Sequence, residues 1–360
     1  MGDYYNGEKL LSKLDINNKV PEIYICDGTR TAGKTFFFKD FLFKKIVNEN
    51  KKIGVITRHQ NTASSIPGAY IKDLAEIKYN GWVSSVSPIG KGKVYKFDFL
   101  APPMVEGSKE RDRYQAGYVF PLTSVEFIKI NSSYFVDVDW MFMDEFQLLD
   151  GAYSNNEVSS LLTIHRSVAR GAGKQTRYVP LIMVGNSLDL YNPYYLTMGI
   201  SQRLQPDTKF LRGDGWVMEH TKNKNAKDAM EKSGVVRALG KGAEDSIFGE
   251  VYLNSPALVV AALPPTAVPY MELTDGKINL QLWFSENYQY RSVLYVTTKE
   301  KNYTTKLGLV STTMDGMGQE GAVMKTFHMS RFIVGFVRGG NIRFVGGKAK
   351  NLFMDILKTL

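Results

Sequence analysis

Two chemically specialised residue types are scarce, since the chain of 360 residues has one cysteine, Cys26, and four histidines. A single cysteine excludes an intrachain disulfide, which fits a reducing compartment. No pair of histidines stands at the spacing of metal ligands, so the sequence offers no structural zinc site. No Ser-His-Asp arrangement for nucleophilic catalysis stands out either.

Long apolar runs are also missing. The longest, such as Leu258–Leu263, are far shorter than the ~18–20 apolar residues that cross a bilayer. The first residues, MGDYYNGEKLL, lack the apolar core of a signal peptide. We therefore expect a soluble, intracellular protein without a membrane partner.

The composition that remains is that of a folded protein. Hydrophobic residues make up 44% and charged residues 22% of the chain, which excludes a disordered class. Lys and Arg number 45 against 36 Asp and Glu, for a net charge of +9. This excess fits a protein that contacts nucleic acid phosphates, although many basic proteins do not. At ~100–200 residues per domain, the length suggests two domains and a small connecting piece.

The first half of the chain alternates short apolar segments with amphipathic ones, which predicts an open α/β sheet with parallel strands. The predicted strands are 23–26, 53–57, 140–144 and 181–184. The predicted helices are 34–48, 71–77 and 156–170, with a hairpin around Gly90–Gly92. In such sheets, ligands bind at the carboxyl ends of the strands.

The pattern changes after residue 212. The polar, lysine-containing residues that follow predict a helical linker or small lid, which we take to residue 254. Farther on, strands at 269–273, 277–284, 291–298 and 305–310, a turn at Asp275-Gly276 and a closing helix at 348–360 predict a hairpin-rich domain. We therefore divide the chain into domains 1–212, 213–254 and 255–360.

The strongest motif is GTRTAGKT, residues 28–35, which fits G-x-x-x-x-G-K-[ST]. The glycines let the backbone approach phosphate, and amides of the loop and helix face the anion. Lys34 supplies a charge to the β and γ phosphates, and Thr35 offers a hydroxyl to Mg²⁺. Because the motif follows an apolar strand and opens a helix, we predict a site for ATP and Mg²⁺ formed by Gly28, Thr29, Arg30, Thr31, Ala32, Gly33, Lys34 and Thr35.

A pair of acids ends the apolar segment WMFMDEF, residues 140–146. Asp144 ends a buried strand, where a carboxylate without a partner is costly, and a Mg²⁺ ion reached through water explains it. Glu145 follows directly and is placed to polarise an attacking water. Taken with the phosphate loop, the pair predicts hydrolysis of ATP with Glu145 as the catalytic base, rather than a surface acid that opens a loop.

Several further polar residues have two readings each. Arg30 lies in the phosphate loop, and Arg58 ends a strand at the same edge of the sheet. Arg166 and Arg170 share a helix face, where arginines either cap the helix end or reach the γ-phosphate of a neighbouring subunit. Asn186, at the tip of the fourth strand, is either a γ-phosphate contact or a turn residue.

Basic residues outside these motifs carry a weaker signal. Two interpretations stay open for them: they bind nucleic acid or an acidic partner, or they are charges on solvent-exposed helix faces. They are Lys222, Lys224, Lys227, Lys232, Lys348 and Lys350.

Three strings together resemble the DNA-packaging ATPases of phi-29-type phages: VDWMFMDEF, NNEVSSLLTIHRSVARGAGKQ and LIMVGNSLDLYNPYY. The family has a strand that ends in Asp-Glu-Phe, a helix that carries an arginine finger, and a strand tip with Asn. Counting along the helix from Glu157 and Val158 places Arg170 on the finger position. The segment PLTSVEFIK resembles one whose lysine acts at the subunit boundary, which makes Lys129 a second candidate in trans beside Arg166. The likeness covers about residues 20–200.

The resemblance implies an N-terminal ASCE-type P-loop ATPase domain, a small helical linker or lid, and a C-terminal α+β domain like ribonuclease H. It also implies a homopentameric ring on the portal of an empty capsid, which drives double-stranded viral DNA inward, and it adds a packaging RNA as a candidate partner. Such a motor works in the host cytoplasm, transiently at the portal vertex. Active nucleases of related terminases need converging carboxylates, whereas Glu272, Asp275 and Asp355 have no convincing third partner on an intervening strand, so we expect no nuclease activity.

Other functions stay open at this stage. One alternative is another nucleic-acid ATPase, such as a RecA-like helicase or a terminase with a working nuclease. A second is a structural module that binds ATP without hydrolysing it, against which Glu145 argues. A small-molecule kinase fits the loop alone, but the Asp-Glu pair favours water as the nucleophile.

Overall fold

The structure is a computed structural model in which the chain forms two compact units. It describes residues 5–28, 33–105, 108–148, 153–154, 156–170, 176–186, 192–201, 203–204, 208–221, 259–286, 292–298, 308–319, 321–338 and 341–357. The first unit spans Met1–Leu188 and Thr208–Glu250, and the second spans Asp189–Asp207 and Val251–Leu360.

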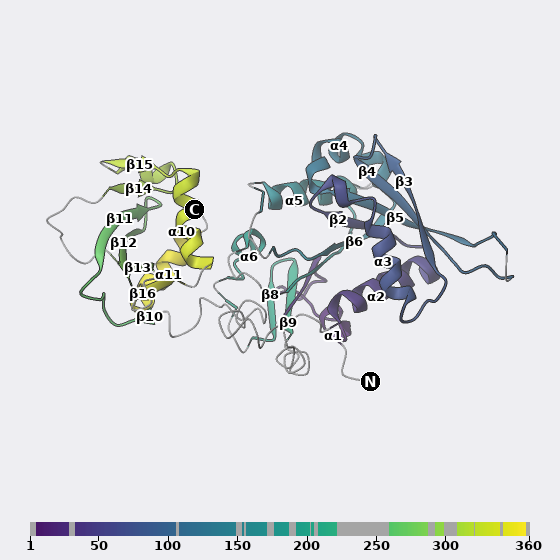
Figure 1. The fold of residues 1–360 in the computed structure, drawn as a ribbon, viewed down its shortest axis with the longest axis horizontal. Coiled ribbons are helices and arrows are strands. Elements are labelled where there is room, and N and C mark those ends of the chain that lie inside the picture. The colour runs from purple at the N-terminus through teal and green to yellow at the C-terminus, as the bar shows by residue number, and fades with distance from the viewer. Residues whose placement is uncertain are drawn as a thin grey trace. The chain divides into compact units, whose positions relative to one another are not determined.

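The first unit is built on a nine-stranded sheet with the order β3-β4-β5-β2-β6-β7-β1-β9-β8 (Figure 1). The strands are β1 (Ile23–Gly28), β2 (Lys52–Thr57), β3 (Val83–Ile89), β4 (Val94–Leu100), β5 (Arg113–Pro121), β6 (Val138–Asp144), β7 (Leu181–Val184), β8 (Phe210–Gly213) and β9 (Trp216–Thr221). The six strands from β5 to β9 in this order pair in parallel, and β3, β4 and β8 add antiparallel edges. The predicted open parallel sheet is confirmed.

Helices cover both faces of this sheet (Figure 1). They are α1 (Glu8–Leu11), α2 (Lys34–Glu49), α3 (Ile66–Ala75), α4 (Val125–Ile130) and α5 (Glu157–Val168), with 3-10 turns η1 (Gln60–Thr62), η2 (Leu122–Ser124) and η3 (Ser132–Phe135). Apolar side chains of α2 and α3 pack in one core with Cys26, Phe142 and Val184 of the sheet. Since side chains alternate along a strand, Met141 and Met143 point to the opposite face, where α4 and α5 lie.

Within this unit, two sequence-based boundaries differ from the structure. The expected helix 71–77 is α3, which begins at Ile66 with Pro67 in its first turn. The linker expected from residue 213 begins no earlier than Thr221, because β9 pairs in parallel with β1 along its whole length. The apolar run of β9, with Val217 and Met218 buried, completes the core beside β1. The lysines expected in the linker, beginning with Lys222, lie outside the described residues.

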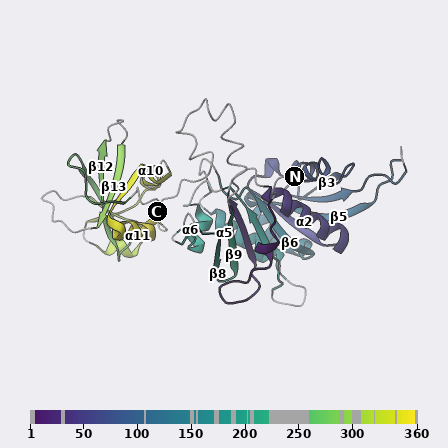
Figure 2. The same cartoon turned by 90° about the horizontal axis from the view of Figure 1, so that it is seen from below.

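The second unit has a seven-stranded sheet with the order β10-β16-β13-β12-β11-β14-β15 (Figure 1; Figure 2 shows the same sheet from below). Its strands are β10 (Val259–Val260), β11 (Val268–Thr274), β12 (Asn279–Glu286), β13 (Ser292–Thr298), β14 (Leu309–Ser311), β15 (Ala322–Met324) and β16 (Ile342–Val345). Its helices are α6 (Pro193–Met198), η6 (Asp315–Gly318), α10 (Phe327–Arg338) and α11 (Gly346–Leu357). The segment that contains α6 groups with this unit and not with the first domain, where we expected it.

The antiparallel meander β11-β12-β13, with β14 parallel to β11, is consistent with the expected ribonuclease H-like domain. Helix α10 contacts the sheet through Phe332 and Phe336 against Phe284. Helix α11 packs Phe353 on Phe344 of β16. In the described part of the chain, no helix is long and apolar enough to cross a membrane.

Candidate nucleotide site at the carboxyl edge of the sheet

Gly28 ends β1 and begins the phosphate-binding motif. Its φ is +146°, and a Cβ at this position would lie 2.0 Å from the carbonyl oxygen of Thr221. Position 28 therefore requires glycine, because the backbone of the paired strand β9 leaves no room for a side chain. Gly33, at the other end of the motif, has φ +88° and caps the amino terminus of α2. Residues 29–32 between them, including Arg30, lie outside the described residues.

Lys34 is the first residue of α2, and only 4% of its surface is exposed. Its Nζ donates a hydrogen bond of 3.0 Å to the carbonyl oxygen of Gly28. A buried ammonium group costs free energy unless anionic or polar partners surround it. Its position at the start of the helix therefore suits it to bind phosphate together with the amides of the first turn of α2.

Thr35 and Asp144 meet beside this lysine, as the motif spacing predicts. Thr35 Oγ1 donates to Asp144 Oδ1 over 3.0 Å, and the amide of Glu145 donates to the same oxygen over 3.1 Å. Burial raises the pKa of Asp144, while the charge of Lys39 and the bond from Thr35 act in the opposite direction. A hydroxyl and a carboxylate side by side are the oxygen ligands that Mg²⁺ prefers, so these residues fit the ion.

Glu145 has a left-handed backbone, with φ +51°, and an exposed side chain. Non-glycine residues seldom adopt this conformation, and it persists where the surroundings enforce it. The conformation turns the chain sharply at the end of β6, directly after Asp144. The carboxylate is thus held at the strand tip and is accessible to water.

Arg58 supplies the surrounding contacts. Its Nη1 donates to the carbonyl oxygen of Glu145 over 2.8 Å, and its Nη2 donates to that of Phe146 over 2.5 Å. Its Nε forms an ion pair of 3.0 Å with Glu157, at the start of α5; the Glu157 side chain is buried and that of Arg58 is half-buried. The guanidinium also stacks over the ring of Tyr153 at 5.6 Å. The sequence placed Arg58 at this edge of the sheet but did not reveal that it holds the segment after Asp144.

A hollow of about 380 Å³ opens next to Lys34. Its lining includes Lys34, Thr35 and Asn186, so the predicted strand-tip asparagine does reach the site. The opposite wall comes from the end of α3, with Asp73, Glu76 and Ile77, which the sequence did not indicate. The sequence could not indicate this wall because α3 is separated from the motif along the chain. Only the packing of α3 on α2 brings the two together.

The predicted trans-acting arginines lie elsewhere. Arg177 Nη2 donates to the carbonyl oxygens of Val168, which ends α5, and Val138, which begins β6. The end of α5 therefore lies at the amino edge of the sheet, about 20 Å of strand length from the Asp144 end of β6. Arg166 and Arg170 are exposed there, away from the phosphate loop of their own chain. Lys129, on α4, is exposed and lies 4.0 Å from Glu126.

The second unit shows the acids expected near its first hairpin. Glu272 on β11 accepts a hydrogen bond from Gln281, and Asp275 caps its own turn through the amides of Lys277 and Ile278. The side chain of Asp355 lies outside the described residues. Among the side chains that the structure describes, no group of three or more His, Cys, Asp or Glu is arranged to hold a metal ion.

No protein-family model matches the chain, and a search of curated proteins found no match either. Two solved structures resemble it over nearly its whole length. The phi-28 gp11 DNA packaging motor aligns with a TM-score of 0.56 and 13% identity, over 100% of this chain and 98% of that one. The bacteriophage phi-29 viral genome packaging motor assembly aligns with a TM-score of 0.53 and 18% identity, over 99% of both chains.

The chain has the fold of these packaging-motor proteins. At such identities the likeness concerns the fold, which agrees with the ASCE-type ATPase domain that the sequence predicts. What the site does has to be argued from its own residues.

Proposed function

We propose that the protein is an ATP-hydrolysing motor that moves double-stranded viral DNA into a preformed capsid. The observation that carries this proposal is the grouping of Lys34, Thr35, Asp144 and Glu145 at the carboxyl edge of a sheet with the packaging-motor fold. A phosphate-binding lysine, a metal-binding pair and an exposed acid are the parts that hydrolysis of a nucleoside triphosphate requires.

Within one chain, each residue has a distinct task. Gly28–Thr35 cradle the phosphates, and Lys34 neutralises their charge. Thr35 and Asp144 hold Mg²⁺, which lowers the charge of the β and γ phosphates when bound. Glu145 orients the attacking water and accepts its proton, and Asn186 contacts the γ-phosphate or the water from the neighbouring strand tip. Arg58 keeps Glu145 in its left-handed conformation.

Arg170 acts on a neighbouring subunit. Its place at the amino edge of the sheet supports this role, because it cannot reach the phosphate loop of its own chain from there. Charge that develops on the phosphoryl oxygens during transfer is stabilised by such an arginine, which contributes a factor of about 10³–10⁵ where it acts. Lys129 and Arg166 are additional cations that can serve the same boundary.

The ring implied by this arrangement is a homopentamer in the host cytoplasm, docked at the capsid portal, with a packaging RNA as a further candidate partner. It grips the phosphate backbone of duplex DNA without reading sequence, since a motor must move along any sequence. The C-terminal unit has no nuclease activity and serves as a docking domain.

The test is steady-state ATP hydrolysis against protein concentration, with and without linear duplex DNA. Arg170→Ala and Glu145→Gln are each expected to be inactive alone, and activity is expected to return when they are mixed, because one supplies the water-activating acid and the other the arginine. Hydrolysis that is linear in protein, indifferent to DNA and not restored by mixing would overturn the proposal.

A further inference from the structure

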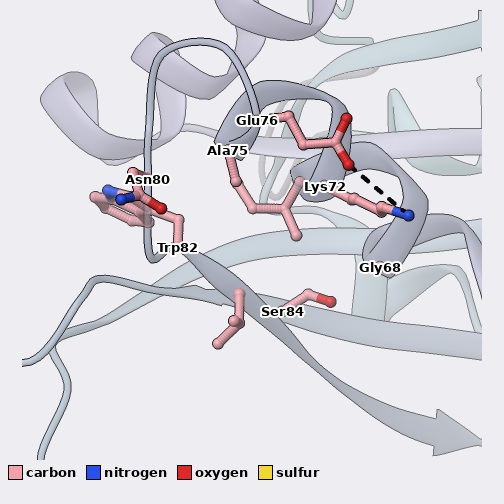
Figure 3. A pocket seen from close by; sticks show the side chains of 9 residues that line it. Gly68, Lys72, Ala75, Glu76, Asn80, Trp82 and Ser84 are labelled. Atoms are coloured by element: carbon pink, nitrogen blue, oxygen red, sulfur yellow. Dashed lines mark ion pairs between the residues drawn. The ribbon is translucent and has the colours of Figure 1, made fainter.

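Two hollows of the first unit meet at one residue, Glu76. The first is the nucleotide hollow already described, which Glu76 and Ile77 line from the end of α3. The second is a groove of about 410 Å³ between α3 and β3, lined also by Trp82 and Val83 (Figure 3). In Figure 3, Lys72 and Glu76 of α3 lie on one side of this groove and Ser84 of β3 lies on the other. The end of α3 is thus a ridge between the nucleotide site and an open groove.

Large apolar side chains are exposed along this ridge. Ile77 is 68% exposed and Val83 is 41% exposed, beside the half-buried Trp82. Scattered single apolar residues on a surface need no explanation, but several around one concave site are typical of an interaction surface. We call Asp73, Glu76, Ile77 and Val83 the acceptor face.

The acids of the acceptor face differ in how firmly they are held. Asp73 is bound to Lys39 at 2.6 Å, and the lysine side chain is largely buried. Glu76 lies 3.8 Å from Lys72, and both side chains are mostly exposed. Exposed pairs of this kind contribute little free energy, so Glu76 can exchange its lysine for a better cation at small cost. An arginine, with its planar fork of donors, is such a cation.

A surface of opposite charge occurs at the other edge of the same unit. Leu162 and Arg166 are one turn apart on α5, and Arg170 follows just after the helix end, so a leucine and two arginines line one side. Ile130 and Tyr134 are exposed beside α5, on α4 and η3, two elements that contact it. We call Ile130, Tyr134, Leu162, Arg166 and Arg170 the donor face.

We propose that the acceptor face binds the donor face of a second copy of this chain, with Arg166 paired to Glu76 and Arg170 inserted into the nucleotide hollow. This inference rests on the proposed function, in which an arginine acts in trans, and adds the surface that receives it. Both faces combine apolar groups with charges of opposite sign, which favours one partner and orientation. Because Glu76 borders both hollows, a cation paired to it brings the next cation toward Lys34 and Asn186.

The placement of the two faces determines the kind of assembly. The donor face belongs to helices on one side of the sheet, and α3 lies on the other side (Figure 1). Two different surfaces of one chain that bind each other form a head-to-tail contact, which closes into a ring when the rotation permits. Because the two faces lie on opposite sides of the sheet, two copies cannot make both contacts at once, and a dimer would leave one face of each kind unused.

A charge exchange tests the contact. Glu76→Lys and Arg166→Glu are each expected to weaken self-association at least about tenfold, because each places like charges together, and the double variant is expected to regain it to within about threefold. Association is measured by sedimentation velocity with a slowly hydrolysed ATP analogue and duplex DNA, together with the rate of ATP hydrolysis. Val83→Glu, on the groove side and away from the phosphate loop, is expected to weaken association as well.

Glu49→Lys is the matched control, since Glu49 is an exposed glutamate at a helix end that pairs with Lys45 four residues away. It should associate as the wild type does. Normal association of Glu76→Lys, or a double variant no better than the single ones, overturns the contact. If mixing Arg170→Ala with Glu145→Gln still restores hydrolysis, the trans-acting ring stands and only this surface is wrong. If mixing also fails, the proposed function falls with it.

Discussion

Arg58 organises the catalytic edge through its geometry rather than through its charge alone. One guanidinium reaches two carbonyl oxygens and a carboxylate in three directions. A lysine presents a single ammonium centre and cannot make the same three contacts. In the proposed mechanism, the side chain therefore acts as a positioning residue for Glu145, the proposed catalytic base.

Arg58→Lys is expected to lower kcat about 10- to 100-fold while the affinity for nucleotide stays within about twofold. The reason is that the phosphate loop remains intact and only the left-handed turn at Glu145 relaxes. Stopped-flow binding of a fluorescent nucleotide, followed by steady-state hydrolysis, separates the two effects.

Arg111→Lys is the control for Arg58, because Arg111 also donates to two backbone carbonyl oxygens, those of Gly81 and Ala101, and none of these residues lines the nucleotide hollow. It should leave hydrolysis unchanged. Equal losses in both variants, or a loss of nucleotide affinity in Arg58→Lys, would show that Arg58 acts through general stability.

Gly28 gives a second prediction at the scale of one residue. Gly28→Ala places a methyl group against the carbonyl oxygen of Thr221, and backbone cannot move aside as a flexible side chain can. With the additional strain of a φ of +146°, we expect the first unit to lose about 3 kcal/mol or more of unfolding free energy. Thermal unfolding followed by tryptophan fluorescence measures the loss. Gly308→Ala should have little effect, because nothing lies within 4 Å of the position that its new methyl group would take.

At the scale of elements, α2 and the segment after α3 are joined through the buried Asp40. Its carboxylate accepts hydrogen bonds from Lys44 at 3.0 Å, Lys78 at 2.8 Å and Tyr79 at 2.7 Å. Burial alone would raise the pKa of Asp40, but these three partners outweigh it, and the pKa is lower than usual. The junction fixes the end of α3, and with it one wall of the nucleotide hollow.

Asp40→Asn is therefore expected to cost about 1–3 kcal/mol at neutral pH, since charge-assisted hydrogen bonds become neutral ones. A carboxylate with a lowered pKa stabilises the fold above its unfolded-state pKa of ~3.9, and loses this effect as pH falls through the folded-state value. The difference between the two proteins should thus shrink below about pH 4. Urea unfolding at a series of pH values checks this, and a constant difference would contradict it.

The sequence predicts an element well where neighbouring residues determine it, and poorly where contacts between distant segments determine it. Helix α2 and strand β6 are predicted to within about two residues because apolar periodicity and the motif that opens the helix specify them. Strand β9 is missed because its place beside β1 is decided by pairing between segments far apart in the chain. The acceptor face and the contacts of Arg58 are missed for the same reason, since both arise where distant segments pack.

At the level of the whole molecule, the resemblance to packaging ATPases implied a trans-acting Arg170 but did not say at which edge of the sheet α5 ends. The bonds of Arg177 to Val138 and Val168 supply this, because they fix the end of the helix at the edge of the sheet farthest from Asp144. Arg170 cannot reach the nucleotide hollow of its own chain, and that hollow opens beside the exposed Glu76. Both observations favour assembly with a second copy. The proposed ring rests on where the two faces lie on the first unit rather than on any single residue.

The net charge of +9 gives the last prediction, which concerns how the whole molecule holds DNA. A motor that grips phosphates displaces counterions, so the logarithm of its DNA affinity should fall linearly with the logarithm of salt concentration, by at least about tenfold between about 50 and 200 mM. Two duplexes of equal length and different sequence should give the same slope. Nucleotide affinity, measured in parallel without DNA, separates this effect from salt acting on the ATP site. Affinity that resists salt, or that differs between the duplexes, would mean that the protein reads base edges, which a translocase moving along any genome cannot depend on.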